Sequence, residues 1–211
     1  MKCIITGCAG FIGSSLSDRL LKEGHKVLGI DNLSTGQLRF MEKSSDYERF
    51  TFIETDLLNI EQLKKIFNGY DIVFHLAANA DVRFGTENPK RDLEQNTIVT
   101  YNVLEAMRHN NIKRIIFSST GSVYGEPKIF PTTEKHPLAP VSYYGVSKLA
   151  GERYVDVFHH LYGLDTTILR YFHVYGPRQE SNEFGGVVSI FLRRITEGKN
   201  PVVFGHGEQV R

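Results

Sequence analysis

The sequence has almost no net charge, only two cysteines and no long apolar run. Its 25 Lys and Arg against 24 Asp and Glu give a formal charge of +1, which favours neither a nucleic-acid partner nor a membrane surface. Cys3 and Cys8 lie too close along the chain for a useful disulfide, so reduced thiols and a cytoplasmic location are predicted. No apolar run approaches the roughly 20 residues of a membrane span, the N-terminus lacks the apolar core of a signal peptide, and no metal site is predicted.

What the sequence does have is a regular alternation of elements and enough apolar residues for a core. Of its 211 residues, 41% are apolar, which suffices to bury a full core. In the first half, short apolar strands alternate with helical stretches, and no internal repeat interrupts them. This alternation predicts an α/β fold with a parallel, doubly wound sheet of the Rossmann type.

Three glycines separate a strand predicted over residues 2–6 from a helix predicted over residues 11–23. Gly7, Gly10 and Gly13 allow the backbone to approach the pyrophosphate of a dinucleotide, whose charge faces the helix N-terminus. A tight strand-to-helix turn needs glycine even without a ligand, so the glycines by themselves leave both interpretations open.

Asp31 favours the dinucleotide. It follows the second apolar run, residues 26–30, where the second strand of a βαβ unit brings a carboxylate to the adenosine ribose. A carboxylate at this place repels a 2′-phosphate, and no Lys or Arg follows before Arg39. The sequence therefore predicts NAD as the cofactor in preference to NADP.

A tyrosine and a lysine four residues apart are candidates for acid/base chemistry. On a helix, Tyr144 and Lys148 share one face, with Cβ atoms roughly 5–6 Å apart. A free tyrosine has a pKa of about 10, and bringing it near 7 takes roughly 4 kcal/mol. A neighbouring ammonium and the positive nicotinamide ring are expected to supply this together. Thr120, in a Ser-Ser-Thr sequence after a strand predicted over residues 114–117, is placed to hydrogen-bond the same substrate hydroxyl. Tyrosine and lysine occur at this spacing by chance on many amphipathic helices. The pair therefore indicates a catalytic site only in combination with the glycine turn and the Ser/Thr strand end.

In order and at family spacing, the chain carries a series of motifs: Thr6-Gly-Cys-Ala-Gly-Phe-Ile-Gly13, Asp31-Asn-Leu-Ser-Thr-Gly36, Asp56-Leu57, His75-Leu-Ala-Ala78, Asn96, Asn102-Val-Leu-Glu-Ala106, Ser118-Ser-Thr120, Val123-Tyr-Gly125, Tyr144-Gly-Val-Ser-Lys148 and Leu169-Arg-Tyr-Phe172. Together they resemble the extended short-chain dehydrogenase/reductases, specifically the NAD-dependent epimerase/dehydratase family of nucleotide-sugar enzymes. Within that family they are most similar to the UDP-glucose 4-epimerases. The resemblance covers essentially the whole chain.

The resemblance implies two regions and two sets of site residues. Residues 1–172 are expected to form the NAD-binding domain with the Tyr/Lys helix, and residues 173–211 the start of a nucleotide-sugar lobe. The implied cofactor-binding residues are Gly7, Gly10, Phe11, Ile12, Gly13, Asp31, Asn32, Ser34, Gly36, Asp56, Leu57, Leu76, Ala77, Ala78, Ala80, Asn96, Tyr144, Lys148 and Phe172. The implied substrate-binding residues are Thr120, Tyr144, His173, Val187, Phe204 and Arg211, and the implied catalytic residues are Thr120, Tyr144 and Lys148.

Two features depart from the family pattern. His173 stands where the family usually has an asparagine that binds the nucleotide-sugar diphosphate. It is interpreted as a diphosphate ligand, as a residue that tunes the pocket, as a sign of a different substrate or as a structural histidine. The final segment, residues 205–211, resembles a motif after which family members continue, so the chain is expected to be truncated and its substrate lobe incomplete.

The favoured function is a nucleotide-sugar 4-epimerase of the UDP-glucose/UDP-galactose type. In this interpretation Tyr144 accepts the proton of the sugar 4-hydroxyl while NAD accepts the C4 hydride. The alternatives are a 4,6-dehydratase or decarboxylase of the same family, and a non-catalytic NAD-binding protein. The dehydratases carry an acidic pair at the positions of Gly121 and Ser122, and the decarboxylases a Glu at the second, which favours the epimerase. By resemblance only, helices over residues 89–109 and 144–162 imply a homodimer.

Overall fold

The computed structural model describes residues 1–80, 82–179, 186–203 and 205–207, and it divides the chain into two compact units. The larger unit is Met1–Phe172 and the smaller one is His173–Arg211. The roles predicted for residues 1–172 and 173–211 remain predictions. The smaller unit contains one helix, α8 (Val187–Thr196), among its described residues.

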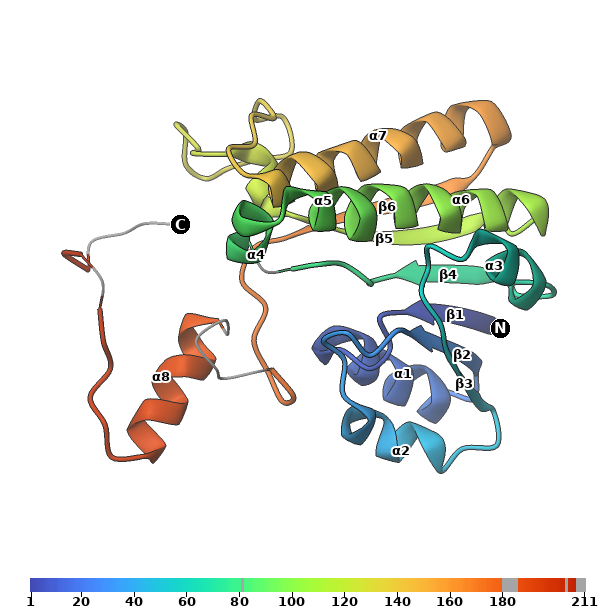
Figure 1. The fold of residues 1–211 in the computed structure, drawn as a ribbon, viewed down its shortest axis with the longest axis horizontal. Coiled ribbons are helices and arrows are strands. Elements are labelled where there is room, and N and C mark those ends of the chain that lie inside the picture. Colours follow the sequence, from blue (N-terminus) through green and yellow to red (C-terminus); the bar gives the residue numbers. More distant parts are fainter. Residues whose placement is uncertain (81, 180–185, 204, 208–211) are drawn as a thin grey trace. The chain divides into compact units, whose positions relative to one another are not determined.

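A six-stranded, fully parallel sheet forms the centre of the larger unit (Figure 1). The spatial order is β3-β2-β1-β4-β5-β6, so the order of the strands reverses between β1 and β4. This is the predicted doubly wound Rossmann-type sheet, in which ligands bind beyond the carboxyl ends of the strands at the reversal. The strands are β1 (Lys2–Thr6), β2 (Lys26–Asp31), β3 (Phe50–Glu54), β4 (Ile72–His75), β5 (Arg114–Thr120) and β6 (Asp165–Tyr171).

Each face of the sheet is packed by its own set of helices. Alternate residues of a strand point to opposite faces, so Cys3 and Ile5 join one core cluster whereas Ile4 joins the other. The first cluster is completed by α1 (Phe11–Lys22) and by η1 (Leu38–Met41), which leads into α2 (Glu42–Ser45). The second is completed by α3 (Ile60–Ile66), α6 (Val99–His109) and α7 (Tyr143–Tyr162).

The helix predicted over residues 89–109 has these bounds in the structure, but it is not α-helical throughout. The structure has α5 (Pro89–Asp92), a π-helical segment η2 (Leu93–Ile98) and then α6, preceded by α4 (Val82–Glu87). In η2, the Asn96 side chain binds Asn79, and the Thr100 hydroxyl donates to the Asn96 carbonyl. These tertiary contacts stabilise the wider turn inside the predicted helix. π-Segments inside helices are frequent at functional sites.

The strand predicted to end at Phe117 continues to Thr120. Ser118, Ser119 and Thr120 pair with β6, where Thr120 lies opposite Tyr171. Polar residues are tolerated here because their hydroxyls have acceptors: Ser118 donates to the His75 carbonyl and Ser119 donates to the Glu152 carboxylate. A short 3₁₀ turn, η3 (Gly121–Tyr124), follows the strand directly.

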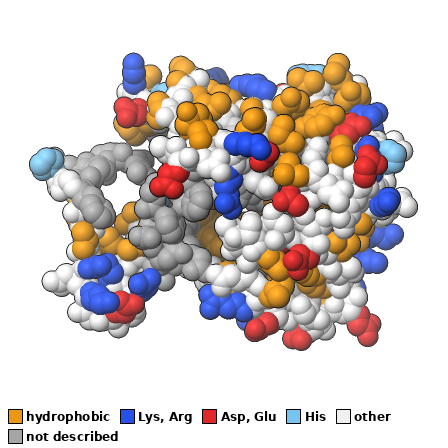
Figure 2. Space-filling model, in the orientation of Figure 1, with side chains coloured by type: hydrophobic (Ala, Val, Ile, Leu, Met, Phe, Trp, Pro, Cys, Tyr) orange, Lys and Arg blue, Asp and Glu red, His pale blue; other side chains and the backbone are white. Residues whose placement is uncertain are grey.

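Apolar side chains are exposed along the outer surface of η2, α6 and α7, where Figure 2 shows them gathered. On α7 they recur at helical spacing, and the rings of Tyr101 and Tyr154 meet edge to face at 5.9 Å. The α6–α7 apolar surface comprises Leu93, Ile98, Tyr101, Tyr154, Val157 and Leu161, each at least 39% exposed. No helix in the described part of the chain is long and apolar enough to cross a membrane.

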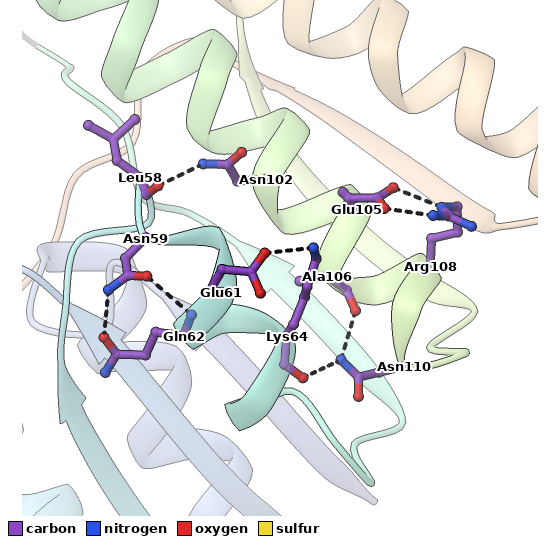
Figure 3. Close-up of polar contacts among 10 residues, drawn as sticks. All are labelled: Leu58, Asn59, Glu61, Gln62, Lys64, Asn102, Glu105, Ala106, Arg108 and Asn110. Atoms are coloured by element: carbon purple, nitrogen blue, oxygen red, sulfur yellow. Dashed lines mark hydrogen bonds and ion pairs between the residues drawn. The ribbon is translucent and has the colours of Figure 1, made fainter.

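Asparagine side chains join α3 to α6 (Figure 3). The Asn102 amide donates to the carbonyls of Leu57 and Leu58, just after β3. Farther along α6, the Asn110 amide donates to the Lys64 carbonyl at the end of α3. These bonds fix the loop beyond β3, which lies at the carboxyl edge of the sheet.

Candidate active site

The carboxyl ends of β1 and β4 approach each other closely at Gly7. Its φ is +73°, which favours glycine, and a Cβ at this position would lie 2.8 Å from the Ala77 backbone nitrogen. The residue after β1 therefore has to be glycine for the β4 loop to pass beside it. This brings Leu76 and Ala77 next to the glycine turn. The cofactor contacts predicted for them and for Ala78 and Ala80 remain predictions.

Gly13 closes the turn from the first helical turn of α1. A Cβ on Gly13 would lie 2.1 Å from the Gly7 carbonyl oxygen, a backbone atom that has little freedom to move. Gly10 is the N-cap of α1, and no side chain caps this end or places an acidic group in its first turn, which includes Phe11 and Ile12. The first amides of α1 therefore suit an anion such as a pyrophosphate.

Asp31 at the end of β2 lies beside this turn. One carboxylate oxygen accepts from the Ala9 amide and the other from the Leu33 amide, each at 2.9 Å. A Cβ on Gly36 would lie 2.8 Å from the Asp31 carboxylate, so the predicted segment Asn32 to Gly36, which includes Ser34, folds back over it. Burial raises the pKa of Asp31, and the backbone amides oppose this. The carboxylate thus shapes the loop in addition to its predicted role at the ribose.

Asp56 and Leu57, two of the predicted cofactor-binding residues, follow β3. The Asp56 carboxylate accepts from the Asn32 amide at 3.0 Å and from the Gln95 amide at 3.3 Å. Leu57 is buried in the core on the α3–α6 face of the sheet. The loops after β2 and β3 are therefore joined at the predicted adenosine end.

A buried histidine holds the loop after β4. The amides of Leu76 and Ala77 donate to the Thr6 hydroxyl oxygen, so the Thr6 proton points to His75 Nδ1, 2.7 Å away. His75 Nε2 then carries the proton and donates to the Thr100 hydroxyl at 3.1 Å. Burial and the Lys148 charge lower the pKa of His75 to about 3, which is consistent with a neutral ring. The Thr6 hydroxyl and this ring fix the backbone on which the predicted cofactor residues lie.

Asn96, a predicted cofactor residue, is engaged within the protein. Its amide nitrogen donates to the Asn79 carbonyl, the Asp92 carboxylate and the Ser147 hydroxyl, and its oxygen accepts from the Asn79 amide. The side chain is 1% exposed. Asn96 therefore joins the β4 loop to η2 and α7, and a direct contact with the cofactor remains a prediction.

The structure brings Thr120 and Tyr144 together at the end of β5. α7 begins at Tyr143, with the Ser142 hydroxyl accepting from the Gly145 amide, and this start places Tyr144 in its first turn. Burial raises the pKa of the Tyr144 phenol, a hydrogen bond with the Thr120 side chain lowers it, and the Asp92 carboxylate raises it. In the chain by itself the pKa is therefore shifted opposite to the expected direction. The lowering predicted for the complex with the cofactor remains a prediction.

Lys148 is almost completely buried one turn farther along α7. It is 1% exposed, and its Nζ lies 4.4 Å from the centroid of the Phe117 ring. Burial lowers the pKa of Lys148 to about 7, and the Glu152 carboxylate opposes this. A lysine that exchanges its proton near neutrality is suited to proton transfer.

Phe172, one of the predicted cofactor-binding residues, lies just beyond β6. Its ring stacks with Tyr124 at 6.1 Å and covers Gly121, where an added Cβ would lie 3.0 Å from it. Phe172 is 55% exposed, so one side of the ring is accessible. The ring therefore lies beside the turn that follows Thr120.

Four predicted substrate residues lie in the smaller unit or beyond the described residues. His173 and Val187 belong to the smaller unit, and both side chains are exposed. Phe204 and Arg211 lie outside the described residues.

Within the described residues, no group of three or more His, Cys, Asp and Glu side chains is arranged to hold a metal ion.

Sequence reasoning missed a buried polar network behind Tyr144 and Lys148. Glu152 is 1% exposed and accepts two hydrogen bonds from Arg170, at 2.9 and 2.7 Å. Arg170 also donates to the Tyr124 hydroxyl at 2.8 Å, and Ser119 donates to Glu152. Arg170 and Tyr124 lie within motifs identified in the sequence, and Glu152 follows Lys148 by one helical turn. That spacing was the available signal for Glu152.

Comparison with known proteins finds close relatives over almost the whole chain. A sequence model of the NAD dependent epimerase/dehydratase family matches residues 3–211. A putative UDP-glucose 4-epimerase from Methanocaldococcus jannaschii is 40% identical over 210 residues, which cover 99% of this chain and 67% of the relative. Decarboxylases of UDP-linked sugar acids are also among the relatives, at 33% identity.

Solved structures show the same fold. The UDP-glucose 4-epimerase of Thermotoga maritima, solved with UDP-glucose, has a TM-score of 0.92 and 40% identity, covering 99% of this chain and 67% of that one. The UDP-glucuronic acid 4-epimerase of Bacillus cereus, in complex with UDP-glucuronic acid and NAD, has a TM-score of 0.88 and 38% identity, again covering 99% and 67%. The chain thus spans about two thirds of the length of these proteins.

Proposed function

Because this chain belongs to the NAD-dependent epimerase/dehydratase family, we propose that it carries the catalytic site of a nucleotide-sugar 4-epimerase acting on a UDP-hexose. NAD is the cofactor, as the sequence predicted. The glycine turn, the uncapped N-terminus of α1 and the Asp31 carboxylate fit the pyrophosphate and adenosine ribose of NAD.

The observation that carries the 4-epimerase proposal is the turn after Thr120. Gly121 has no side chain, and a Cβ there would lie 3.0 Å from the Phe172 ring, so a larger residue has to displace that ring. Ser122 is the next residue, and its hydroxyl accepts from Thr120 at 3.2 Å. Neither residue supplies the carboxyl groups with which family members remove water or carbon dioxide. Simple interconversion at C4 needs no such group.

Three side chains have proposed roles in the reaction. Tyr144 accepts the proton of the sugar 4-hydroxyl and later returns it, and Thr120 hydrogen-bonds the same hydroxyl. Lys148, when charged, stabilises the phenolate of Tyr144 from one turn along α7. Bound NAD supplies the hydride acceptor for oxidation at C4. The buried ends of β5 and α7 hold these groups in fixed positions and exclude water from Lys148.

Product analysis tests this proposal. The full-length protein is incubated with NAD and UDP-glucose, UDP-galactose or UDP-glucuronic acid in separate reactions, and the products are separated and identified by mass spectrometry. We expect interconversion of the two epimers, an unchanged substrate mass and no net NADH. A product lighter by one water identifies a dehydratase, and consumption of a UDP-linked sugar acid with loss of carbon dioxide identifies a decarboxylase. Either product overturns the 4-epimerase proposal.

A homodimer through the α6–α7 apolar surface is the proposed assembly. The surface places three exposed aromatic or aliphatic side chains at helical spacing on α7 beside those of η2 and α6. Light scattering after size-exclusion chromatography should give twice the mass of the chain, and Leu161→Glu should give a monomer. Val141→Glu, at a 78% exposed loop residue, is the control that should remain dimeric. A monomeric unmodified protein contradicts the assembly without affecting the proposed reaction.

A further inference from the structure

Glu152 is a buried carboxylate that fold stability does not explain. It is 1% exposed and is held by Ser119 of β5 and by two nitrogens of Arg170 on β6. The free energy of removing both charges from water offsets much of the attraction between them. Well-packed apolar residues therefore often replace a buried ion pair without loss of stability. The place of this carboxylate relative to the candidate active site therefore calls for an explanation.

Glu152 and Lys148 meet the same face of β5. They are four residues apart on α7 and therefore project from one side of the helix, with Cβ atoms roughly 5–6 Å apart. Their partners on β5 are two residues apart, so they too share a face: Lys148 lies over the Phe117 ring and Glu152 accepts from Ser119. The carboxylate and the ammonium are consequently neighbours in a region closed to solvent.

The other charged or titratable groups around Lys148 do not replace this carboxylate. On β4, the lowered pKa of His75 is consistent with a neutral ring. On α5, the Asp92 carboxylate raises the pKa of Tyr144. Arg170 on β6 binds both Glu152 and the Tyr124 hydroxyl of η3. On α6, Glu105 and Arg108 pair with each other. Glu152 is the carboxylate that raises the pKa of Lys148 against the effect of burial.

We propose that Glu152 is a positioning residue of the active site: its carboxylate, fixed by Ser119 and Arg170, is the buried counter-charge that keeps Lys148 an ammonium beside Tyr144. This inference rests on the proposed roles of Tyr144 and Lys148. Arg170 holds the carboxylate in place and, through the Tyr124 hydroxyl and the stacking of Tyr124 on Phe172, connects it to the turn after Thr120.

Direct titration of Lys148 tests the proposal without any sugar turnover. The 211-residue chain is labelled with ¹³C at the lysine Cε, and the Lys148 signal is assigned by its loss in Lys148→Met and followed from pH 5 to 10. Glu152→Gln keeps the shape of the side chain and removes its charge, so the pKa of Lys148 should fall by about one pH unit or more. Arg170→Gln removes the opposing charge and leaves the carboxylate, so this pKa should rise.

Opposite shifts of the Lys148 pKa in the two variants indicate an electrostatic role of Glu152. General loosening of the structure would shift this pKa in the same direction in both. Glu105→Gln is the matched control, because Glu105 also binds an arginine through two nitrogens, at 2.8 and 2.6 Å, but on α6 (Figure 3). It should leave the Lys148 titration unchanged. An unchanged Lys148 pKa in folded Glu152→Gln, or shifts of the same sign in both variants, overturns the proposal. If Glu152→Gln does not fold, Arg170→Gln is compared with Arg170→Lys, which disturbs the same contacts but keeps the positive charge. A rise of the Lys148 pKa in Arg170→Gln only supports the proposal, and equal shifts in both variants, or no rise, refute it.

Discussion

Replacement of Lys148 by methionine is expected to stabilise the fold at neutral and acidic pH. The pKa of Lys148 falls from 10.5 to about 7 because its ammonium is buried. At about 1.4 kcal/mol for each pH unit, holding the charged form in the folded state costs at most about 5 kcal/mol. Methionine keeps an unbranched chain over Phe117 without the charge. Loss of the ammonium–ring contact offsets about 0.5–2 kcal/mol of the gain, so we expect a net gain of no more than about 3–4.5 kcal/mol at pH 6.

The pH dependence is the sharper part of this prediction. Below about pH 7, Lys148 is charged in the folded and unfolded states, and the full cost is present. Between about 7 and 10.5, the folded chain loses the proton before the unfolded chain does, so the stability of the unmodified protein rises with pH. The advantage of Lys148→Met should therefore shrink through this range.

Urea unfolding followed by circular dichroism at pH 6, 8 and 9.5 measures both effects. Lys90→Met is the control, because Lys90 is an exposed lysine, paired with Glu94, whose replacement should change the free energy of unfolding by less than about 0.5 kcal/mol at every pH. If Lys148→Met is less stable than the unmodified protein at pH 6, or if the difference does not change with pH, the ammonium is not held at a cost to folding and the reasoning is refuted.

Three further predictions concern the site. Tyr144→Phe should lower turnover of the full-length protein by about 10²–10⁴-fold with NAD affinity unchanged. The control, Tyr143→Phe, changes a neighbouring residue that is 55% exposed and should leave turnover nearly unchanged. A loss of less than about tenfold in Tyr144→Phe points to another base. Calorimetric titration should show NAD binding at least about tenfold tighter than NADP because of Asp31, and equal affinities contradict this. Gly13→Ala should abolish NAD binding or folding, since its Cβ meets the Gly7 carbonyl at 2.1 Å. Gly24→Ala should lose some stability because φ there is +87°, but it has open space around it and should retain binding.

Local patterns sufficed for the elements that build the sheet. The apolar run of residues 2–6 and the glycines after it predicted β1, the turn and the start of α1 correctly, because strand burial and helix entry are set by neighbouring residues. The parallel, doubly wound sheet, the family and NAD are likewise confirmed. The residue assignments at the site remain predictions, although the structure gathers those of the larger unit along the carboxyl edge of the sheet.

The features that sequence reasoning missed depend on partners distant in the chain. β5 continues through Ser119 and Thr120 because β6 pairs with it and Glu152 accepts the Ser119 proton. The π-helical η2 is stabilised by Asn79, which lies 17 residues before Asn96. Neither partner is visible in the local pattern. The same applies to Arg170, whose guanidinium meets Glu152 only when β6 lies beside β5.

The hydrogen bonds around His75 run in one direction, from the Thr6 hydroxyl through the ring to Thr100 and on to the Asn96 carbonyl. Each member has to accept on one side and donate on the other, so these positions are not independent for protein engineering. Serine at position 6 or 100 keeps a hydroxyl that both donates and accepts. Valine has a similar shape but no hydroxyl, so it leaves His75 Nδ1 (at position 6) or Nε2 (at position 100) without its hydrogen-bond partner. A library that varies positions 6, 75 and 100 one at a time will reject replacements that are acceptable in combination. The Thr6 hydroxyl also accepts from the Leu76 and Ala77 amides, so position 6 has to keep a hydroxyl even when all three positions are varied together.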